Sequence, residues 1–468
     1  MKPSSILSLA GAALVSCTFG PDWTAPTMPV PVEFRGAGVG GSTMADLPWQ
    51  QVLHDGRLQN LLEDVFNHNR DLTALFHNVD AASQYITIAQ APLFPWVGYG
   101  GSASKGMNSA GGASITQAGG RTTNPGSIQA SASWELDIWG KTRREVESAE
   151  ASAQAAQEQL NALRVSLLRT VACGYLQPLM LDEQLGISKE AVESYRDSLQ
   201  LFQNQLDGGI GDKLQTSAAA AALAAAEAEV PALESEIAAL EHSLSALAGR
   251  MPGPIARGGS LSAFAKASKV STGIPADALA RRPDVRAAEQ EMRAANAEIG
   301  VAIASYFPSI SLTAAGGYAS GDLRTTVMGH RSGWGIGANL TGPLFQAGQL
   351  RANERIKRDN FLAAKADYEK TVLEAMSEIF TTLTQRRNLS AILAKQEQAV
   401  AAYQESVQLS KSRYSSGLAN YYEVLTAQQG LFPAQKQLAA YRYQYAAIIP
   451  TLYTQLGGGW DRSQEKKK

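Results

Sequence analysis

The stretch from Ile128 to Ile138 reads I-Q-A-S-A-S-W-E-L-D-I, and apolar and polar residues alternate along its whole length. Successive side chains of a β-strand point to opposite faces, so this period of two predicts a strand with one apolar and one polar face. A half-buried strand of a soluble sandwich shows the same alternation. The stretch alone therefore predicts a strand and leaves its surroundings open.

Three further stretches, at residues 97–104, 309–314 and 334–341, repeat this alternation with small or hydroxyl side chains between the apolar ones. Aromatic residues stand at the ends of the four stretches: Trp96, Trp139, Phe307 and Trp334. Strands that cross an outer membrane have about 9 to 11 residues, an apolar face toward lipid, a polar face toward a lumen, and aromatic girdles. We therefore expect two membrane strand pairs, 96–104 with 128–138 and 309–318 with 334–341.

The apolar face of the 128–138 strand is expected to face lipid, through Ile128, Trp134, Leu136 and Ile138. Four strands cannot close a barrel, because the smallest bacterial barrels have about eight and an open edge in lipid leaves backbone groups unpaired. The chain must then associate with copies of itself. Two copies would supply eight strands and three would supply twelve, and the long polar lumen favours the wider barrel.

Composition excludes several functions. The net charge of −2 argues against a nucleic-acid surface, and no apolar run of about 20 residues lies outside the N-terminal leader. The five histidines show no metal-ligand spacing. The S-x-x-K match at 102–105 and the glycines at 208–211 lack the strand-to-helix context of catalytic or phosphate motifs. We expect no enzyme, no cofactor and no metal site.

The N-terminus carries Lys2, an apolar run over residues 6–15, and then Cys17. An ordinary signal peptide with an incidental cysteine is one interpretation. The alternative is preferred here, because a cysteine after a small residue at the end of such a run resembles a bacterial lipobox. We expect a signal peptide over 1–16, lipidation of Cys17 and a lipidated tether over 17–54. Thr18, in place of a retaining aspartate, implies sorting to the outer membrane by the same resemblance.

Helical spacing of apolar residues begins near Asp55 and continues to about Gln90. From Thr142 to about Leu206 the sequence predicts one helix of roughly 100 Å at 1.5 Å per residue, and a second helix runs from the glycine-rich break at 207–212 to Gly249. Together they predict an antiparallel coiled-coil hairpin. Pro178 and Pro231 lie inside these helices and should bend them.

The second half of the chain repeats the first. Y-F-P-S-I at 306–310 echoes L-F-P-W-V at 93–97, and placing Gly209 on Gly417 puts Gly249 on Gly457 without a gap. The sequence thus indicates a tandem duplication. We expect a first repeat over 55–249, a connector over 250–275, a second repeat over 276–457 with helices at about 350–414 and 421–456, and a tail over 458–468.

Several motifs together resemble the bacterial outer-membrane factor family, and within it the lipoprotein branch of NodT- and OprM-like efflux channels related to TolC. The motifs are C-T-F-G-P-D-W-T-A-P from Cys17, N-R-D-L from Asn69, A-R-R-P-D-V-R-A-A-E from Ala280, R-Y-S-S-G-L-A-N-Y-Y-E-V-L-T-A-Q from Arg413, and L-G-G-G-W from Leu456. The resemblance spans nearly the whole mature chain.

The resemblance implies a mainly α fold with membrane β-strands. Three protomers would share a twelve-stranded β-barrel in the outer membrane that continues into a twelve-helix α-barrel in the periplasm. The implied partners are two further copies of the chain, outer-membrane lipid, a periplasmic adaptor of the membrane-fusion type, and an inner-membrane pump of the resistance-nodulation-division (RND) type.

Family position also implies site residues. Tyr422 and Thr426 are expected to line a constriction at the periplasmic entrance, with Arg413 available for a tethering contact across the hairpins. Thr426 stands where family members often carry an aspartate, so closure is expected to be chiefly steric. The helical turns that hold Gly209, Gly211, Gly417 and Asn420 are expected to contact the adaptor.

The function expected first is a passive conduit that exports small molecules such as drugs, toxic compounds or metals. A type I secretion duct for polypeptides has the same architecture and is the second interpretation. A soluble periplasmic scaffold is the third, and it predicts release of an unlipidated protein without detergent. The nine methionines are scattered, so the sequence does not indicate a copper or silver cargo.

Overall fold

The computed structural model of the chain describes residues 18–26, 28–29, 43–108, 121–123, 126–262, 264, 275–320 and 332–459. Cys17, the signal peptide, part of the connector and the tail beyond Gly459 lie outside these residues. The chain divides into two compact units, one of residues 1–26, 78–156 and 287–368 and the other of residues 27–77, 157–286 and 369–468. Long helices continue from one unit into the other, and each unit is described by itself.

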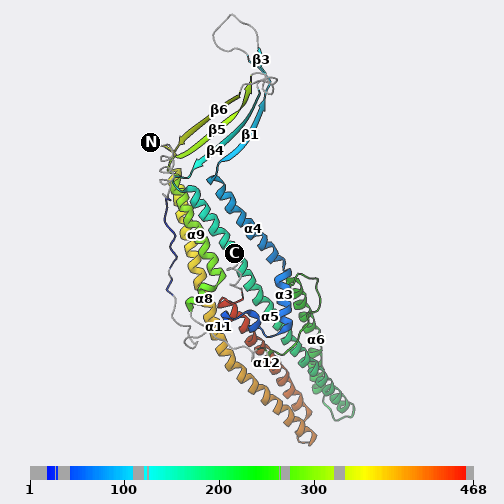
Figure 1. The fold of residues 1–468 in the computed structure, drawn as a ribbon. Helices are drawn as coiled ribbons and strands as arrows, with labels where there is room; N and C mark the ends of the chain where they lie inside the picture. Colours follow the sequence, from blue (N-terminus) through cyan, green and yellow to red (C-terminus); the bar gives the residue numbers. More distant parts are fainter. Residues whose placement is uncertain are drawn as a thin grey trace. The chain divides into compact units, whose positions relative to one another are not determined.

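The first unit contains a four-stranded antiparallel sheet with the order β1-β4-β5-β6 (Figure 1). Its strands are β1 (Trp96–Ala103), β4 (Gly126–Leu136), β5 (Ser309–Ser320) and β6 (Ser332–Thr341). A separate two-stranded sheet pairs β2 (Gly106–Asn108) with β3 (Arg121–Thr123). The two strand pairs that the alternation predicts are therefore present.

One expected strand residue lies outside the sheet. β4 ends at Leu136, and Ile138 belongs to the turn that follows. The reason is the start of the next helix: the Asp137 carboxylate accepts the backbone N–H groups of Thr142 at 3.0 Å and Arg143 at 3.1 Å, which uses this residue as a cap. The expectation that Ile138 lies on a lipid-facing strand is wrong.

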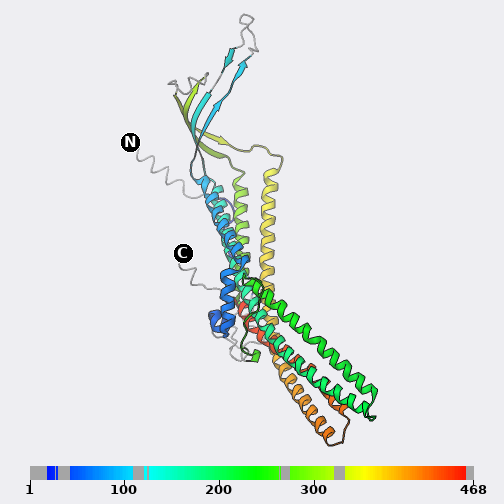
Figure 2. The ribbon, with the colours of Figure 1, turned by 90° about the vertical axis from the view of Figure 1, so that its right-hand side faces the viewer.

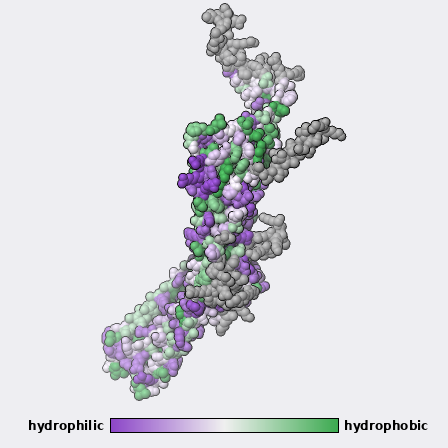
Figure 3. Space-filling model, turned by 90° about the vertical axis from the view of Figure 1, so that its left-hand side faces the viewer, coloured by the Kyte–Doolittle hydropathy of each residue, from purple (hydrophilic) through white to green (hydrophobic). Residues whose placement is uncertain are grey.

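The strand register places the apolar residues of all four strands on one face. Ala132 lies opposite Val97 and Ala314, and Ala314 lies opposite Ile336. Directly opposed residues of a sheet point to the same side. Trp96 is an exception, because it lies opposite Ser133 on the polar face. Figure 3 shows hydrophobic side chains gathered over the part of the molecule that holds the sheet.

The chain just after Cys17 is fixed against the base of this sheet. The Phe19 ring stacks on Phe307 at 4.4 Å between centroids, and its backbone N–H donates to the Trp139 carbonyl oxygen at 3.3 Å. The Arg144 guanidinium is buried and lies 3.0 Å from the Asp22 carboxylate. This part of the expected tether is thus a packed segment of the first unit.

The expected helix from Asp55 to Gln90 is two helices, α3 (Gly56–His68) and α4 (Arg70–Gln90). The backbone of Asn69 leaves the helical conformation between them. Its side-chain oxygen accepts the Leu72 N–H at 3.0 Å, and its amide donates to the Leu247 carbonyl oxygen at 2.9 Å. The long apolar pattern hides the break because both helices bury the same type of residue.

The two long hairpins agree closely with their predicted bounds. They are α5 (Lys141–Asp207) with α6 (Lys213–Leu247), and α11 (Gln349–Ser415) with α12 (Tyr421–Gln455). Figure 2 shows each as two helices joined by a turn, with α5 and α6 running from cyan-green to green and α11 and α12 running from yellow through orange to red. Pro178 and Pro231 lie within α5 and α6, as expected. Within the described residues no helix combines the length and apolarity needed to cross a membrane.

The remaining elements are short or precede β5: η1 (Met44–Asp46), α2 (Trp49–Val52), η2 (Ala91–Leu93), α8 (Pro275–Arg281) and α9 (Pro283–Ala304). The long helices of the two halves match in length. α5 and α11 each have 67 residues, and α6 and α12 each have 35. The same spacing separates the positive-φ glycines Gly140 from Gly348, Gly209 from Gly417, and Gly249 from Gly457.

Candidate functional site

The turns at the ends of the two helical hairpins have the same backbone geometry. Gly209 and Gly417 adopt φ values of 76° and 71°, a left-handed conformation that a residue without Cβ adopts at no steric cost. The N–H of Ile210 donates to the Gln205 carbonyl at 3.0 Å, and that of Leu418 donates to Arg413 at 2.9 Å. This six-residue closure is the Schellman pattern, which satisfies the last carbonyls of each helix.

A side-chain cap starts the helix after each turn. The Asp212 carboxylate accepts the Leu214 N–H at 2.9 Å, and the Asn420 side chain accepts the Tyr422 N–H at 3.1 Å. Asn420 thus has a structural role as an N-cap. Gly211 leaves no room for a side chain, because a Cβ there would lie 2.4 Å from the Leu206 backbone nitrogen.

Both turns expose large apolar side chains. Ile210 is 84% exposed in the first turn, and Leu418, which holds the corresponding place in the second, is 73% exposed. Leu214 and Tyr422 follow them at the helix starts and are also exposed. Exposed apolar groups that gather at one site are typical of surfaces that bind a partner.

The three expected constriction residues lie close together at the second turn. Tyr422 and Thr426 are both exposed and lie one helical turn apart on α12, where the Thr426 hydroxyl donates to the Tyr422 carbonyl oxygen at 2.9 Å. Arg413 lies at the end of α11, with its Nη1 3.6 Å from the Glu423 Oε2. The Arg413 partner inside one chain is therefore in its own hairpin.

Sequence reasoning missed Glu423. The available signal was its place in the first turn of α12, where a carboxylate is favoured by the helix N-terminus. Glu423 stands next to Tyr422, so the exposed face at this turn carries a carboxylate as well as an aromatic ring. Both charged partners are about half exposed, and an exposed pair of this kind contributes about 0 to 1 kcal/mol.

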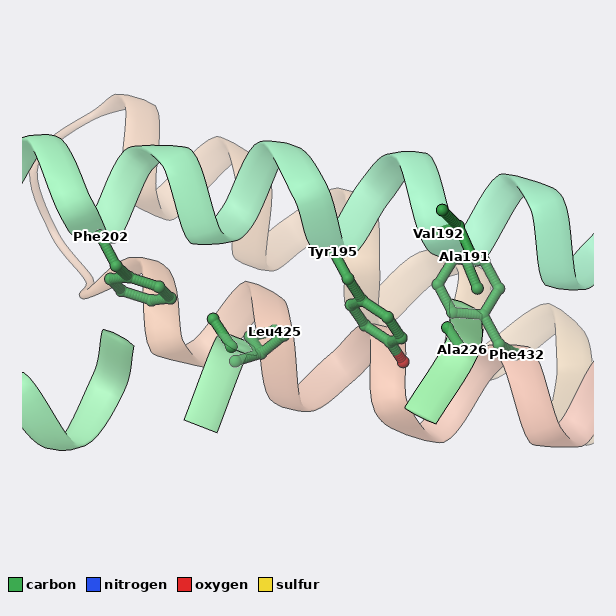
Figure 4. Close-up of a cluster of buried hydrophobic side chains, with 8 residues drawn as sticks. Ala191, Val192, Tyr195, Phe202, Ala226, Leu425 and Phe432 are labelled. Carbon is green, nitrogen blue, oxygen red and sulfur yellow. The ribbon is translucent and has the colours of Figure 1, made fainter. Parts of the chain in front are cut away.

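A buried cluster behind the second turn joins the two hairpins. It consists of Ala191, Val192, Tyr195, Phe202, Ala219, Ala226, Leu425 and Phe432, and we call it the tip core (Figure 4). These residues come from α5, α6 and α12. Tyr421 packs against the tip core with its ring edge-on to Phe202 at 5.6 Å and to Tyr414 at 4.9 Å. The neighbouring Tyr422 is thereby left on the exposed side of the helix.

Polar contacts between α5 and α12 accompany the tip core. The Gln428 amide donates to the Ser194 hydroxyl at 2.6 Å, although Gln428 is only 2% exposed. Gln205 of α5 also donates to the Tyr414 hydroxyl of α11 at 3.5 Å, so α5 contacts both helices of the second hairpin. Burial and the nearby Glu229 carboxylate raise the pKa of Tyr195 to about 12, so this phenol stays neutral. α12 therefore contacts α5 through aromatic and amide groups.

A second and purely aliphatic cluster joins α12 to its own hairpin partner α11. It contains Val400, Val407, Leu431 and Leu438. α12 is thus packed on two sides, by α5 through the tip core and by α11 through this cluster. A movement of the turn at 415–420 would have to break one of these contacts.

Three of the four residues expected to face lipid lie on the apolar face of β4, and the fourth, Ile138, lies outside the strand. Ile128 and Trp134 lie on the shared apolar face of the sheet, where the Trp134 indole donates to the Leu93 carbonyl oxygen at 3.0 Å. Leu136 is the last residue of β4, opposite Ile310. Among the described residues no group of three or more His, Cys, Asp or Glu side chains is placed to hold a metal ion.

Comparison with known proteins gives the identity of the fold. The family model for outer membrane efflux proteins matches residues 61–250 and 274–458. The chain belongs to the outer membrane efflux protein family. ArpC of Pseudomonas putida, an antibiotic efflux pump outer membrane protein, is 32% identical over 470 residues, covering 97% of this chain and 96% of ArpC. The cation efflux system protein CusC of Escherichia coli O6:H1 is 29% identical over 468 residues, covering 99% of this chain and all of CusC.

Solved structures of efflux channels agree. The outer-membrane channel OprN has a TM-score of 0.85 at 28% identity, over 95% of this chain and 100% of OprN. The open state of the Neisseria gonorrhoeae MtrE channel has a TM-score of 0.84 at 25% identity, over 95% of this chain and 99% of MtrE. The expected fold class is thereby confirmed: a TolC-like channel protomer that is mainly helical and has a β portion.

The family gives the biochemical role. The protein is the outer-membrane channel component of a tripartite efflux system, located in the outer membrane and extending into the periplasm. Channels of this family form trimers and work with an adaptor and an inner-membrane pump. The expectation of a transport role is confirmed.

Proposed function

We propose that the trimer is a passive conduit for small molecules, driven by an inner-membrane pump of the RND type. The observation that carries this proposal is the likeness over the full length to channels whose names specify antibiotic, toluene and cation efflux. No bond is made or broken along such a path. The pump supplies the energy and the channel supplies a polar route past the outer membrane.

Loss of the gene tests this directly. Cells that lack the protein should accumulate a fluorescent efflux substrate such as ethidium, and the wild-type gene on a plasmid should restore export. A matched strain without the cognate pump should accumulate the dye to the same degree. Normal export of small dyes together with failed secretion of a polypeptide would favour the secretion-duct interpretation instead.

The two hairpin turns are the proposed adaptor site. Gly209, Gly211, Gly417 and Asn420 fix the shape of the turns, and the exposed Ile210 and Leu418 supply apolar contact area. A photo-crosslinking amino acid at Leu418 should capture the adaptor in cells. The same amino acid at Lys370, which is exposed on α11 far along the chain from the turn, should not.

Tyr422, Thr426 and Arg413 are the proposed constriction. Three copies of the turn at 415–420 would meet near the axis of a trimer, so the exposed Tyr422 rings would form the narrowest ring and Thr426 the next one above it. Arg413 and Glu423 would stiffen each turn. Closure by this arrangement is steric, with a carboxylate near the opening.

Lipidation of Cys17 is proposed as an auxiliary anchor. The residue after it, Thr18, packs against Gly140, where an added Cβ would lie 2.8 Å from the Thr18 methyl group. Thr18 thus lies beside the turn that follows β4. Palmitate labelling of the wild-type protein that disappears in Cys17→Ser, with trimer retained, is the expected result.

A further inference from the structure

The apolar face of the sheet carries a hollow of about 550 Å³, lined by β4, β5 and β6 together with Pro95. Its apolar side chains form two rows across the strands, with three alanines among three larger residues: Ala132, Ala314 and Ile336 in one row, and Trp134, Leu312 and Ala338 in the next. Each alanine ends at its Cβ while its neighbours reach further. The hollow therefore lies over the alanines.

The surroundings of this hollow determine what can fill it. An outer-membrane channel turns the apolar face of its strands toward lipid, where no water is present to fill a void. Among the described residues no side chain occupies the hollow. Apolar atoms that line an empty void lose dispersion contacts, so a hydrocarbon chain is the fitting occupant.

The segment after Cys17 is fixed at the ends of two of these strands. The Phe19 ring stacks at 4.4 Å between centroids on Phe307, which lies just before β5. The Phe19 N–H donates at 3.3 Å to the carbonyl oxygen of Trp139, which follows β4. Cys17 is bonded directly to Thr18, so the Cα atoms of these two residues are about 3.8 Å apart. A lipid chain on Cys17 would therefore begin close to the ends of β4 and β5.

Two buried polar side chains hold this segment in place. Arg144 is 5% exposed, and its Nε donates to the Phe19 carbonyl oxygen at 3.3 Å. Asn296 is 4% exposed, and its amide donates to the Pro21 carbonyl oxygen at 3.0 Å. Loss of either acceptor would leave a buried donor unsatisfied, which is unfavourable. The fold thus fixes the point from which a lipid chain on the N-terminus would start.

The hollow lies within reach of such a chain. Ala132 stands four residues before Leu136, the last residue of β4, which corresponds to about 14 Å along a strand. One leaflet of the hydrocarbon core is about 15 Å deep, half of a core about 30 Å thick, and a lipid acyl chain spans one leaflet. A chain that starts beside the end of β4 therefore extends as far as Ala132 and Ala314.

We propose that an acyl chain of Cys17 lies in this hollow, which we call the acyl groove. The proposal rests on the lipidation of Cys17 proposed above, and it gives the lipid a binding site on the protein's own sheet. Free phospholipids also offer hydrocarbon chains, but the Cys17 chain is tethered beside the groove, which raises its effective concentration there. The lipid then stabilises the sheet as well as holding the protein in the membrane.

A photoreactive lipid tests the occupant directly. Cells grown with a palmitate analogue that carries a diazirine would attach it to Cys17 as well as to phospholipids. After irradiation, the purified trimer is digested and its peptides are analysed by mass spectrometry. The expected product joins the peptide that begins with Cys17 to a strand peptide that holds Ala132, Ala314 or Ala338. A crosslink from a phospholipid has a different mass, because it joins no second peptide.

Two failures of this experiment are distinguishable. Acylated Cys17 peptides that crosslink only to lipids or to other parts of the protein, with phospholipid adducts on the groove peptides, would overturn the acyl groove and leave the lipidation intact. Absence of any acylated Cys17 peptide from the wild-type protein would overturn the lipidation and the acyl groove together.

Filling the groove tests what the lipid contributes to stability. Ala314→Phe places a ring in the groove. The matched control, Ala103→Phe, places the same ring on the apolar face at the last residue of β1, outside the groove. Each is combined with Cys17 or with Cys17→Ser, and the serine variants are expressed behind an ordinary secretory leader so that the leader is still removed.

The readout is the temperature at which the trimer dissociates on gels. Cys17→Ser should lower this temperature in the otherwise wild-type protein and in Ala103→Phe, because the acyl groove loses its occupant. It should leave the temperature of Ala314→Phe unchanged, because the ring already excludes the lipid chain. An equal drop in all three proteins, or no drop in any of them, would contradict the acyl groove.

Discussion

In both repeats a buried side chain beside a helix start bonds to the end of a hairpin, and we call this contact the joint. The chemistry of the joint differs between the two repeats. Asn69 in the first repeat and Arg282 in the second are both buried, and each donates to the carbonyl of the last residue of a hairpin, Leu247 at 2.9 Å and Gln455 at 3.5 Å. Asn69 is neutral and also caps α4. Arg282 is an ion that needs further partners.

Those partners are two carboxylates. The Arg282 guanidinium lies 2.6 Å from Asp284 and 3.0 Å from Glu378. Burial works to lower the pKa of Arg282, but the hydrogen bonds and charges of Asp284 and Glu378 together raise it above its usual value. Duplication thus preserved the backbone geometry of the joint, while the side chains that satisfy it diverged.

Two glycines beside the joint explain why its backbone geometry is the same in both repeats. A Cβ on Gly249 would lie 2.2 Å from the His68 carbonyl oxygen, and one on Gly457 would lie 2.5 Å from the Arg281 Cβ. Both glycines have a positive φ. Close approach and backbone conformation each require glycine, so neither repeat could change this position without moving two helices.

The largest effect is expected where the repeats share one face. Ala132→Arg in the first repeat and Ala314→Arg in the second place a charge on the apolar face near mid-strand, at about 2 to 4 kcal/mol per protomer and thus about 6 to 12 per trimer. Both should reduce trimer in outer-membrane fractions. Thr313→Arg, on the opposite face, should assemble. Normal assembly of Ala314→Arg with loss of Thr313→Arg would invert the assignment of faces.

At the joint, loss of the charged residue Arg282 should destabilise the fold more than loss of the neutral Asn69. Arg282→Ala leaves two carboxylates and a carbonyl without their donor and should destabilise the fold by about 3 kcal/mol, measured by heat denaturation of purified protein. The neighbouring Arg281→Ala loses a more exposed pair with Asp46 and should cost about 1 kcal/mol or less. Equal losses from both variants would contradict the special role of Arg282.

Loss of the neutral residue Asn69 should cost less stability. Asn69→Ala removes the cap of α4 and the donor to Leu247, for about 1 to 2 kcal/mol, in the same melting experiment. Asn69→Asp keeps the capping oxygen and should recover part of that loss. A loss from Asn69→Ala larger than that from Arg282→Ala would reverse the comparison between the repeats.

The smallest effect is expected on ion selectivity. Thr426→Asp adds a ring of carboxylates to the proposed constriction, which attracts cations and repels anions. Reversal potentials in planar bilayers under a salt gradient should shift toward the cation potential with little change in conductance. An unchanged potential would place Thr426 outside the pore.

Much of this architecture is predictable because its signals are periodic. The alternation of apolar and polar residues predicts the strand pairs. The spacing of apolar residues, together with Gly209 and Gly417, predicts the helix bounds of the hairpins to within about two residues. The break at Asn69, the end of β4 before Ile138, and the partner of Arg413 were not predictable. Each depends on a single side chain that bonds to a backbone group or pairs with a charge. Such single contacts produce no periodic pattern in a sequence.

The turn at 415–420 in the second repeat is proposed to close the conduit. Tyr422 and Leu214 hold corresponding places in the two turns and are both exposed. Single-channel recording of purified trimers should show low conductance for wild type, a clear increase for Tyr422→Ala, and no change for Leu214→Ala. Conductance that stays at the wild-type level in Tyr422→Ala, or that rises equally in Leu214→Ala, would contradict the claim.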